Sequence, residues 1–203
     1  MSQLTVLENF IAIEGLDGAG TTTQAKRVAS RLAESRQVHL TCEPTDGEIG
    51  RLIRRILRGE LSAEPRSVAH LFAADRTDHL YHGEKGIVER LRRGETVITD
   101  RYLFSSLAYQ SVECGFDFVL RLNDPFPLPR HLIYLDIDPD LGDRRTAGRG
   151  SRELYERIAF QREVQELYER ALGRFEGNGM LLHRLDGSLA VNELTDRILS
   201  LLS

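Results

Sequence analysis

The sequence predicts one α/β domain, a three-layer sandwich in which helices cover both faces of a five-stranded parallel sheet. Short apolar runs alternate along the 203 residues with segments that repeat apolar side chains at helical spacing. This alternation is typical of parallel sheets, because each strand needs a crossover helix to return to the same edge. Residues 1–203 contain no linker rich in glycine and serine and no internal repeat, so we expect a single domain.

The expected strands are short apolar runs, as buried parallel strands should be. They are Phe10–Glu14, Val38–Thr41, Thr96–Thr99, Leu132–Ile137 and Met180–His183. Helical patterns fill the intervals, at residues 21–35, 48–58, 66–93, 103–111, 152–174 and 188–202. Asn123–Arg130, with three prolines, is expected to be a connector, and Arg144–Arg152 a charged loop. Ligands in such sheets bind beyond the carboxyl ends of the strands, which places the site at residues 15–22, 42–47 and 100–110.

The turn after the first expected strand has the glycine spacing of a phosphate-binding loop. Gly15 and Gly20 fit the pattern G-x-x-x-x-G-K-[ST], and Thr22 stands at its final hydroxyl. Glycine lets the backbone curl so that N–H groups converge on one phosphate, and the following helix adds its positive dipole end. One face of that helix carries Ala25, Val28, Ala29 and Leu32. The residues expected to bind a nucleoside triphosphate are Gly15, Leu16, Asp17, Gly18, Ala19, Gly20, Thr21 and Thr22.

The lysine of this pattern is missing, because Thr21 stands in its place. The chain has 25 arginines and only two lysines, Lys26 and Lys85. Lys26 lies five residues beyond Thr21 on the same helix, which points it elsewhere and about 7 Å further from the phosphates. Lys85 lies deep in the helix expected at residues 66–93. We therefore expect the replacement cation to be an arginine or a bound ion.

Composition and charge exclude several classes of protein. With 41% apolar and 29% charged residues, the chain can bury a substantial core. A net charge of −4 argues against a nucleic-acid coat protein or a polybasic membrane binder, so we expect no nucleic-acid or membrane partner. No stretch approaches the ~20 apolar residues that span a bilayer. Cys42 and Cys114 are too few for a disulfide framework, and we expect reduced thiols and a cytoplasmic location.

Four further segments carry residues suited to phosphate chemistry. They are Thr-Cys-Glu-Pro-Thr-Asp-Gly at 41–47, Leu-Phe-Ala-Ala-Asp-Arg at 71–76, Val-Ile-Thr-Asp-Arg-Tyr-Leu-Phe-Ser-Ser-Leu-Ala-Tyr-Gln at 97–110 and the basic stretch at 144–152. With Gly-Leu-Asp-Gly-Ala-Gly at 15–20, their order and spacing resemble the thymidylate kinase (dTMP kinase) family across nearly the whole chain. The resemblance implies a P-loop kinase that transfers the γ-phosphoryl group of MgATP to dTMP, giving dTDP for dTTP synthesis, and a homodimer.

Several of these residues suit the reaction by their own chemistry. Asp100 ends an apolar strand, where its carboxylate can hold hydrated Mg²⁺ together with the Thr22 hydroxyl. Arg101, the next residue, can bind the acceptor phosphate through two parallel hydrogen bonds. Phe72 and Arg76 are four residues apart in a helix, so a ring and a cation project from one face.

The resemblance assigns further contacts with dTMP. It implies that Phe72 stacks on thymine and that Arg76 contacts the polar edge of the base. Ser106 is implied near the base, and Tyr109 beside the ribose 2′ position. The remaining implied contacts are Asp17 with the 3′-hydroxyl or the metal, Tyr168 in the sugar pocket and Arg101 on the phosphate.

An arginine-rich lid is expected at about residues 142–153, over the phosphates of ATP. Arg149, with Arg145 or Arg152, is expected to close on the β- and γ-phosphates as the replacement cation. Arg101 and Asp17 complete the expected catalytic set. If the lid arginines do not serve, backbone N–H groups and Mg²⁺ must carry the charge.

Plainer roles compete for several residues. Asp17 can cap a helix, and Phe72 can belong to the core, the usual place of a helical phenylalanine. Cys42 can be a small buried side chain at a strand end. His79 and His82 share a helix face, but no third metal ligand stands near them in sequence. A basic helix face is usually solvated, and the chain has one at Arg51, Arg54, Arg55 and Arg58.

Three departures from the family pattern leave the function open at this stage. Thr21 replaces the loop lysine, and Cys42 stands where the family has an arginine before Glu-Pro. Ser151–Leu154 replaces the usual Asp-Arg-Ile-Glu of the lid. These losses suit a weakened or inactive nucleotide-binding homologue, and a related kinase with another acceptor is a third hypothesis. The retained Thr22, Asp100, Arg101 and basic lid favour an enzyme over an inactive homologue.

Overall fold

The structure is a computed structural model that describes residues 5–146 and 151–202, with side chains described from residue 157 onward in the second range. At its centre is a parallel sheet with the strand order β2-β3-β1-β4-β5. The strands are β1 (Val6–Gly15), β2 (Val38–Cys42), β3 (Thr96–Asp100), β4 (Leu128–Asp136) and β5 (Leu181–Asp186). Each of the five expected runs falls on a strand, although Ile137 and Met180 lie just outside β4 and β5, and the predicted fold class is confirmed.

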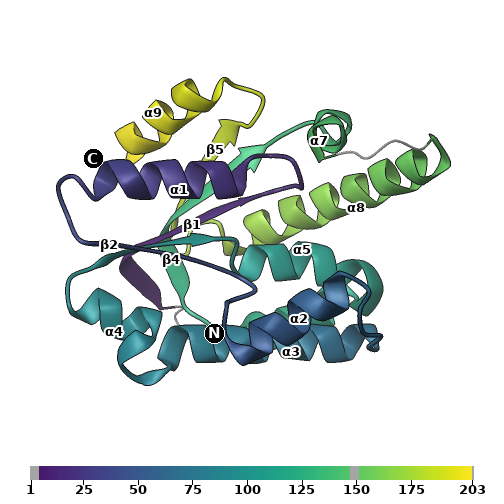
Figure 1. Cartoon of the computed structure of the whole chain (residues 1–203), viewed down its shortest axis with the longest axis horizontal. Helices are drawn as coiled ribbons and strands as arrows, with labels where there is room; N and C mark the ends of the chain where they lie inside the picture. Colours follow the sequence, from purple (N-terminus) through teal and green to yellow (C-terminus); the bar gives the residue numbers. More distant parts are fainter. Residues whose placement is uncertain (1–4, 147–150, 203) are drawn as a thin grey trace.

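Helices cover both faces of the sheet and produce three layers (Figure 1). On one face α1 (Thr21–Leu32) packs against α9 (Val191–Leu201). The other face carries α4 (Ile87–Arg92), α5 (Leu103–Cys114) and α8 (Ser151–Phe175). The remaining α-helices of the described residues are α2 (Glu48–Leu57), α3 (Pro65–Tyr81), α6 (Phe116–Asn123) and α7 (Pro139–Thr146).

The single helix expected at residues 66–93 is wrong. The chain forms α3, then the 3₁₀ turn η1 (Gly83–Lys85), then α4. Gly83 has a φ of 43°, and the backbone of Gly86 is extended. A Cβ atom on Gly86 would lie 2.6 Å from the carbonyl oxygen of Leu80, so the chain can turn this tightly only at a glycine. Lys85 consequently lies in the turn and not deep in a helix.

Two helices were missed by the sequence analysis. After α5 the chain turns at Gly115, whose φ is 80°, and forms α6 before the prolines of the connector. α7 includes Arg144 and Arg145, and α8 begins at Ser151, so the charged loop expected over Arg144–Arg152 is wrong at both ends. Each helix has only eight residues, too few for apolar periodicity to indicate it from the sequence.

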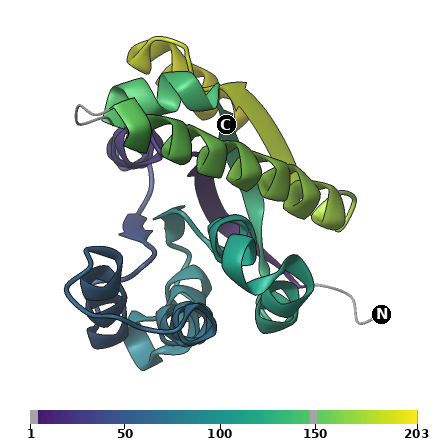
Figure 2. The same ribbon diagram turned by 90° about the vertical axis from the view of Figure 1, so that its right-hand side faces the viewer.

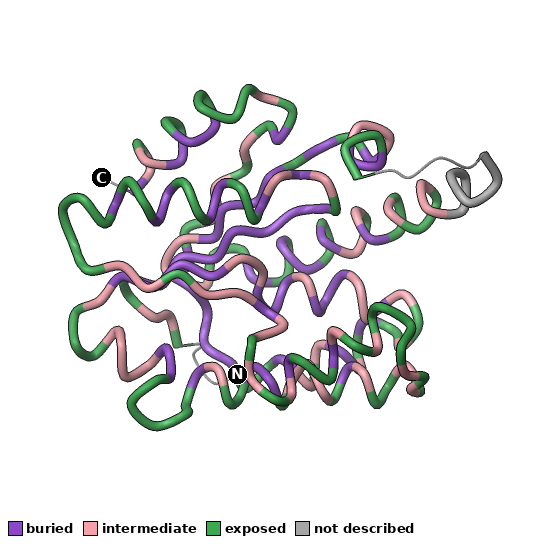
Figure 3. The backbone as a smooth tube through the Cα atoms, in the orientation of Figure 1, coloured by how far each residue is buried: buried purple, intermediate pink, exposed green. Residues whose placement is uncertain are grey.

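The core lies between the sheet and the helices on each face. Figure 3 shows the buried residues gathered on the strands and on the inner faces of the helices. Residues Phe10–Gly15 of β1 are all buried, because β1 is the central strand and both of its faces are covered. Within the described residues, no helix is long and apolar enough to cross a membrane. Because the strands are parallel, their carboxyl ends lie together at one edge of the sheet, where the polar residues of the candidate site begin.

Candidate active site

The phosphate loop connects β1 to α1 and turns at two glycines with positive φ, Gly18 (81°) and Gly20 (93°). Gly20 precedes α1, which begins at Thr21 without a side-chain hydrogen bond at its N-cap. Asp17 therefore does not cap this helix, and the capping alternative is wrong. The first N–H groups of α1 remain available for an anion, as nucleotide binding requires.

Helix α7 lies directly against the loop. A Cβ atom on Gly18 would lie 2.2 Å from the carbonyl oxygen of Gly142, and one on Gly142 would lie 2.6 Å from that of Asp17. Arg145 of α7 donates hydrogen bonds to the carbonyl oxygens of Gly187, at 2.9 Å, and Gly18, at 3.3 Å. A close approach that needs glycine on both sides thus places Arg145 beside the loop. No sequence pattern indicated this role of Gly142.

A cavity of 650 Å³, here called the loop cavity, follows the phosphate loop. All of Leu16–Thr22 lines it, and Arg145 and the segment between β5 and α9 supply the opposite wall. The residues of that segment and of the start of α9 on the wall are Gly187, Leu189, Val191 and Leu194. This combination of backbone N–H groups, one arginine and apolar side chains suits a triphosphate that carries a base.

A second cavity of 810 Å³, here called the large cavity, lies between the regions of α2–α3 and of the phosphate loop. In Figure 2, α2 and α3 lie on one side of the carboxyl end of the sheet, and α7 and α8 on the other. The expected acceptor residues on its wall are Asp17, Phe72, Arg76, Arg101, Ser106 and Tyr109. Phe72 is half-buried and outside the core, so the core alternative for this residue is wrong.

Asp17, Thr22 and Arg101 line both cavities. The two cavities therefore meet at the residues that the sequence analysis assigned to phosphate and metal chemistry. A group bound in one cavity can reach a group in the other at this point. This is the arrangement that transfer between two bound molecules needs.

Thr22 and Asp100 come together where the cavities meet. The Thr22 hydroxyl donates to Oδ2 of Asp100 at 2.5 Å, and Oδ1 of Asp100 is buried without a described partner. Within the described residues, no group of three or more His, Cys, Asp or Glu could hold a metal by itself. A hydroxyl and one carboxylate fit Mg²⁺, which keeps several waters and takes its other ligands from substrate phosphates.

Arg101 is held in a demanding conformation, with a φ of 69°. Its guanidinium donates to Oδ1 of Asp17 at 2.7 Å, to the carbonyl oxygen of Gly15 at 3.1 Å and to Oγ of Ser105 at 3.1 Å. The Arg101 guanidinium also lies 5.2 Å from the centre of the Tyr109 ring. The cation is thus fixed at the meeting point of the cavities before any phosphate binds.

Glu14 and Tyr168 form a buried hydrogen-bonded pair next to Arg101, whose Nη1 donates to Tyr168 Oη. Glu14 is fully buried, and it accepts hydrogen bonds from Ser105 Oγ (2.5 Å), the Tyr102 N–H (2.8 Å) and Tyr168 Oη (2.9 Å). Burial raises the pKa of Glu14, although these donors and Arg101 oppose the shift. Tyr168 is fully buried and is not on the wall of the large cavity, so its place is behind Arg101.

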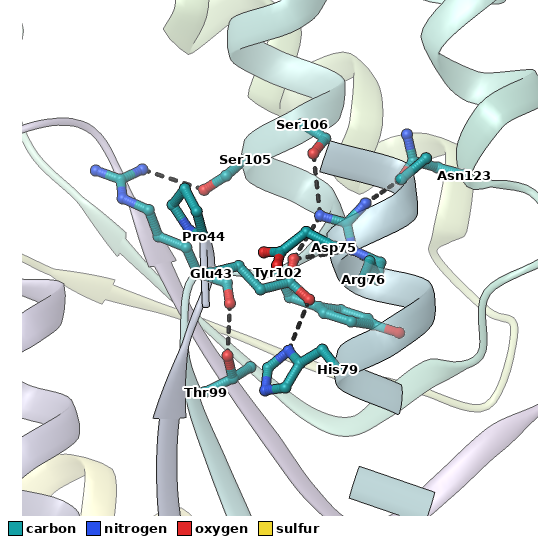
Figure 4. Close-up of polar contacts among 12 residues, drawn as sticks. Glu43, Pro44, Asp75, Arg76, His79, Thr99, Tyr102, Ser105, Ser106 and Asn123 are labelled. Atoms are coloured by element: carbon teal, nitrogen blue, oxygen red, sulfur yellow. Dashed lines mark hydrogen bonds and ion pairs between the residues drawn. The ribbon is translucent and has the colours of Figure 1, made fainter. Parts of the chain in front are cut away.

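Arg76 is almost fully buried, with 1% of its side chain exposed, and Figure 4 shows it directed at Glu43. Its Nε and Nη2 donate to Glu43 Oε2 at 2.9 and 2.6 Å, Nη2 also donates to Ser106 Oγ at 3.0 Å, and Nη1 donates to Asn123. An arginine has five N–H donors, so these four bonds leave one for a ligand in the cavity. Arg76 therefore serves chiefly to hold Glu43 and Ser106 in place.

Arg54 turns into the large cavity, and the expectation of a solvated face is wrong for this residue. Its Nη2 donates to the carbonyl oxygen of Pro44 and lies 3.4 Å from Sγ of Cys42. The Arg54 Nε is buried and has no described partner. Cys42 is half-buried and also lines the cavity. A guanidinium from α2 therefore lies against the cysteine that replaces the family's arginine, a juxtaposition that helical periodicity did not reveal.

Other sequence-predicted residues fall outside the cavities or outside the described residues. His79 bonds to Glu43 Oε1 at 3.0 Å and to Thr41 Oγ1 at 2.7 Å, whereas His82 bonds to Asp78. The two histidines thus have separate partners. Arg149 lies outside the described residues, and the side chain of Arg152 does too. The expected role of both in the lid stays a prediction.

Besides Asp100 Oδ1 and Arg54 Nε, two further buried polar atoms of residues lining the large cavity have no described partner. They are Oη of Tyr109 and Oε1 of Gln110, both on α5. Burial raises the pKa of Tyr109, so its hydroxyl is protonated at neutral pH and available to donate. Unpaired buried groups are costly, and a bound polar ligand would satisfy them.

Two cavities that meet at a phosphate loop, a strand-end carboxylate and a fixed arginine define a P-loop phosphotransferase. The family model described as thymidylate kinase matches residues 13–198. The chain belongs to the thymidylate kinase family. It is 39% identical over 184 residues to a protein of Methanococcus aeolicus named "Probable thymidylate kinase", with 89% of each chain covered. A protein of the same name from Pyrobaculum calidifontis is 42% identical over 161 residues, with 78% of this chain and 80% of the relative covered.

Proposed function

We propose that the protein is a dTMP kinase that transfers the γ-phosphoryl group of MgATP to dTMP, giving dTDP for dTTP synthesis. The observation that carries this proposal is the shared wall of the two cavities, where Asp17, Thr22 and Arg101 meet. Membership of the thymidylate kinase family, and the names of its relatives, support dTMP as the acceptor.

The large cavity takes dTMP in this proposal. Phe72 stacks on thymine, and the free N–H of Arg76 reaches its polar edge. Tyr109 borders the ribose at the 2′ position, where a ring leaves little room for a hydroxyl. Arg101 and Arg54 bind the phosphate from opposite elements, the end of β3 and α2. Arg54 supplies the positive charge that Cys42 does not.

The loop cavity takes ATP. Backbone N–H groups of the phosphate loop bind the triphosphate, and Arg145 lies beside the loop on α7. Arg149 and Arg152 complete the cationic set from the lid. When bound, Mg²⁺ neutralises phosphate charge, and Thr22 with Asp100 holds it where the cavities meet.

Transfer at this point needs no general base. The dTMP phosphate has a second pKa of about 6, so at neutral pH it is largely a dianion with a nucleophilic oxygen. That oxygen forms a bond to the γ-phosphorus as the bond from this phosphorus to the bridging oxygen of ADP breaks. The protein aligns the two nucleotides and neutralises the charge of the moving group, which is most of catalysis in phosphoryl transfer.

We further propose a homodimer in the cytoplasm. The family resemblance supports the dimer. Cys42 and Cys114 are both free thiols, which suits a reducing compartment. Sedimentation of the purified protein tests the assembly directly, because a dimer of a 23.0 kDa chain has twice that mass.

³¹P NMR of the purified protein with MgATP and dTMP tests the proposed reaction. We expect dTDP and ADP to appear in equal amounts, and thymidine to give no product. Titration of dTMP and ATP in the same samples measures binding separately. Binding of both nucleotides without transfer would identify an inactive homologue, and transfer to another monophosphate alone would identify a different kinase.

A further inference from the structure

Lys26 lies on the wall of the large cavity and not on that of the loop cavity, so it points away from the phosphate loop, as expected, and toward the proposed acceptor site. It follows Thr22 by four residues on α1, and residues at this spacing share one helix face. Helical side chains also lean toward the N-terminus of their helix, which carries the Lys26 ammonium back toward Thr22.

Lys26 differs from the arginines on the same wall by its lack of partners. Arg101 is bonded to Asp17, Arg76 is bonded to Glu43, and Arg54 donates to the carbonyl oxygen of Pro44. Lys26 is exposed, and among the described residues it has no hydrogen bond or ion pair. Its ammonium group is therefore the cation of this wall that is most available to a ligand.

The balance of charge around the large cavity also depends on Lys26. Four cations and four carboxylates line it, and the carboxylates are Asp17, Glu43, Asp46 and Asp100. Burial lowers the pKa of His39, the histidine on this wall, so His39 adds no positive charge at neutral pH. Without Lys26 the wall would carry a net negative charge, which opposes the binding of a phosphate dianion.

We propose that Lys26 binds the phosphate group of the nucleoside monophosphate acceptor, from the α1 side of that phosphate. The proposal rests on the proposed function of the large cavity. It differs from the role of a phosphate-loop lysine, because Lys26 lines the large cavity and not the loop cavity. The phosphate loop lacks a lysine because Thr21 stands at its position, and in this proposal Lys26 supplies a positive charge at the acceptor phosphate instead.

Chemical labelling of the unmodified protein tests this contact, because the chain has only two lysines. Acetylation by acetic anhydride is followed at Lys26 and Lys85 by mass spectrometry. Lys85 is exposed, lies in η1 and lines neither cavity, so it serves as the internal reference. Saturating dTMP is expected to slow acetylation of Lys26 about tenfold and to leave Lys85 unchanged, because a charge-assisted hydrogen bond holds the amine. Thymidine, which lacks the phosphate, is expected to protect Lys26 much less.

Binding by variants gives an independent readout. Lys26→Gln is expected to weaken dTMP binding about tenfold in calorimetry and to leave thymidine binding unchanged. Lys26→Arg keeps the charge and is expected to keep dTMP affinity within about threefold. Lys85→Gln is the matched control and is expected to bind both ligands as the unmodified protein does.

The outcomes separate this proposal from the proposed function. If dTMP binds more tightly than thymidine, but Lys26→Gln leaves that difference intact, Lys26 does not bind the phosphate. Equal protection of Lys26 from acetylation by thymidine and dTMP would likewise overturn the proposal, since contact with the base and sugar would then account for the protection. A protein that binds neither ligand overturns the proposed function and this proposal with it.

Discussion

The hydroxyl of Thr22 donates a hydrogen bond to Oδ2 of Asp100 over 2.5 Å, joining the start of α1 to the end of β3. These residues are 78 positions apart in sequence. The parallel register of β1 with β3 places Ile13 opposite Asp100, two residues before the phosphate loop. The sheet therefore brings the two proposed metal ligands together, and local sequence does not.

Replacement of Asp100 by asparagine tests this pair. Asp100→Asn keeps the shape of the side chain but removes its charge, so kcat is expected to fall by about 10²- to 10³-fold, as for loss of one preorganised charge. The Mg²⁺ concentration needed for half-maximal rate is expected to rise. Initial rates across a Mg²⁺ series measure both effects, and Asp117→Asn, which alters an exposed carboxylate of α6, is the control. An unchanged Mg²⁺ dependence would show that Asp100 does not hold the metal.

Arg54 is expected to bind the acceptor phosphate. Arg54→Ala is expected to lower kcat/KM for dTMP by about 10- to 100-fold, within the range for loss of a charged hydrogen bond. Arg54→Lys should restore only part of this, because lysine cannot make paired hydrogen bonds. Arg55→Ala, which alters the neighbouring residue of α2, should remain near the unmodified rate. Equal kinetics of Arg54→Ala and Arg55→Ala would show that Arg54 does not bind the acceptor phosphate.

Tyr109 is expected to select deoxyribose by steric exclusion. Tyr109→Ala opens space, so the ratio of kcat/KM for dTMP to that for ribothymidine monophosphate should fall more than dTMP turnover itself. Tyr109→Phe keeps the ring and should keep the ratio, which separates the ring from the unpaired hydroxyl. Rates with the two nucleotides provide the measurement. If Tyr109→Ala leaves the ratio of the two kcat/KM values unchanged, Tyr109 does not select deoxyribose by steric exclusion.

Glu43 makes stability depend on acid pH. Burial pushes its pKa up, but Arg76 and His79 outweigh burial and hold the pKa below the ordinary 4.5. As pH falls through about 4.5, the unfolded chain therefore takes up a proton before the folded protein does, and stability is lost from there down to the folded pKa. Free energies of unfolding in urea at several pH values measure this loss.

A Glu43→Gln variant isolates that effect. It should be less stable by ~3–5 kcal/mol at pH 7, because Arg76 would be left buried without its charge partner. Its stability should then change less than that of the unmodified protein below pH 4.5. Glu34→Gln alters an exposed carboxylate and should retain the unmodified profile. A Glu43→Gln variant with an unaltered acid profile would contradict the assignment.

Sequence patterns predicted the strands because parallel strands buried on both faces are continuous apolar runs. They predicted the phosphate loop and the Asp100–Arg101 pair because these follow directly from strand ends. They failed where tertiary contact decides the outcome. Nothing local indicates that Arg54 turns toward Pro44, or that Gly142 approaches Gly18.

Two other failures have simple physical causes. The long helix of residues 66–93 was predicted from periodicity alone, although Gly83 and Gly86 mark a tight turn. The pairing of Arg76 with Glu43, distant in sequence, uses most of the arginine's donors and was not foreseen, whereas its expected contact with the base stays a prediction. Long-range ion pairs of this kind are not encoded in any spacing along the chain.

A competition assay tests the central claim most directly. The protein is given MgATP with equal concentrations of dTMP, dUMP, ribothymidine monophosphate and AMP, and the diphosphates formed are separated and counted over time. The account predicts that dTDP forms first and in excess, because Phe72, Tyr109 and the acceptor-phosphate cations act together on dTMP. Preferential formation of any other diphosphate, or formation of none, would contradict it.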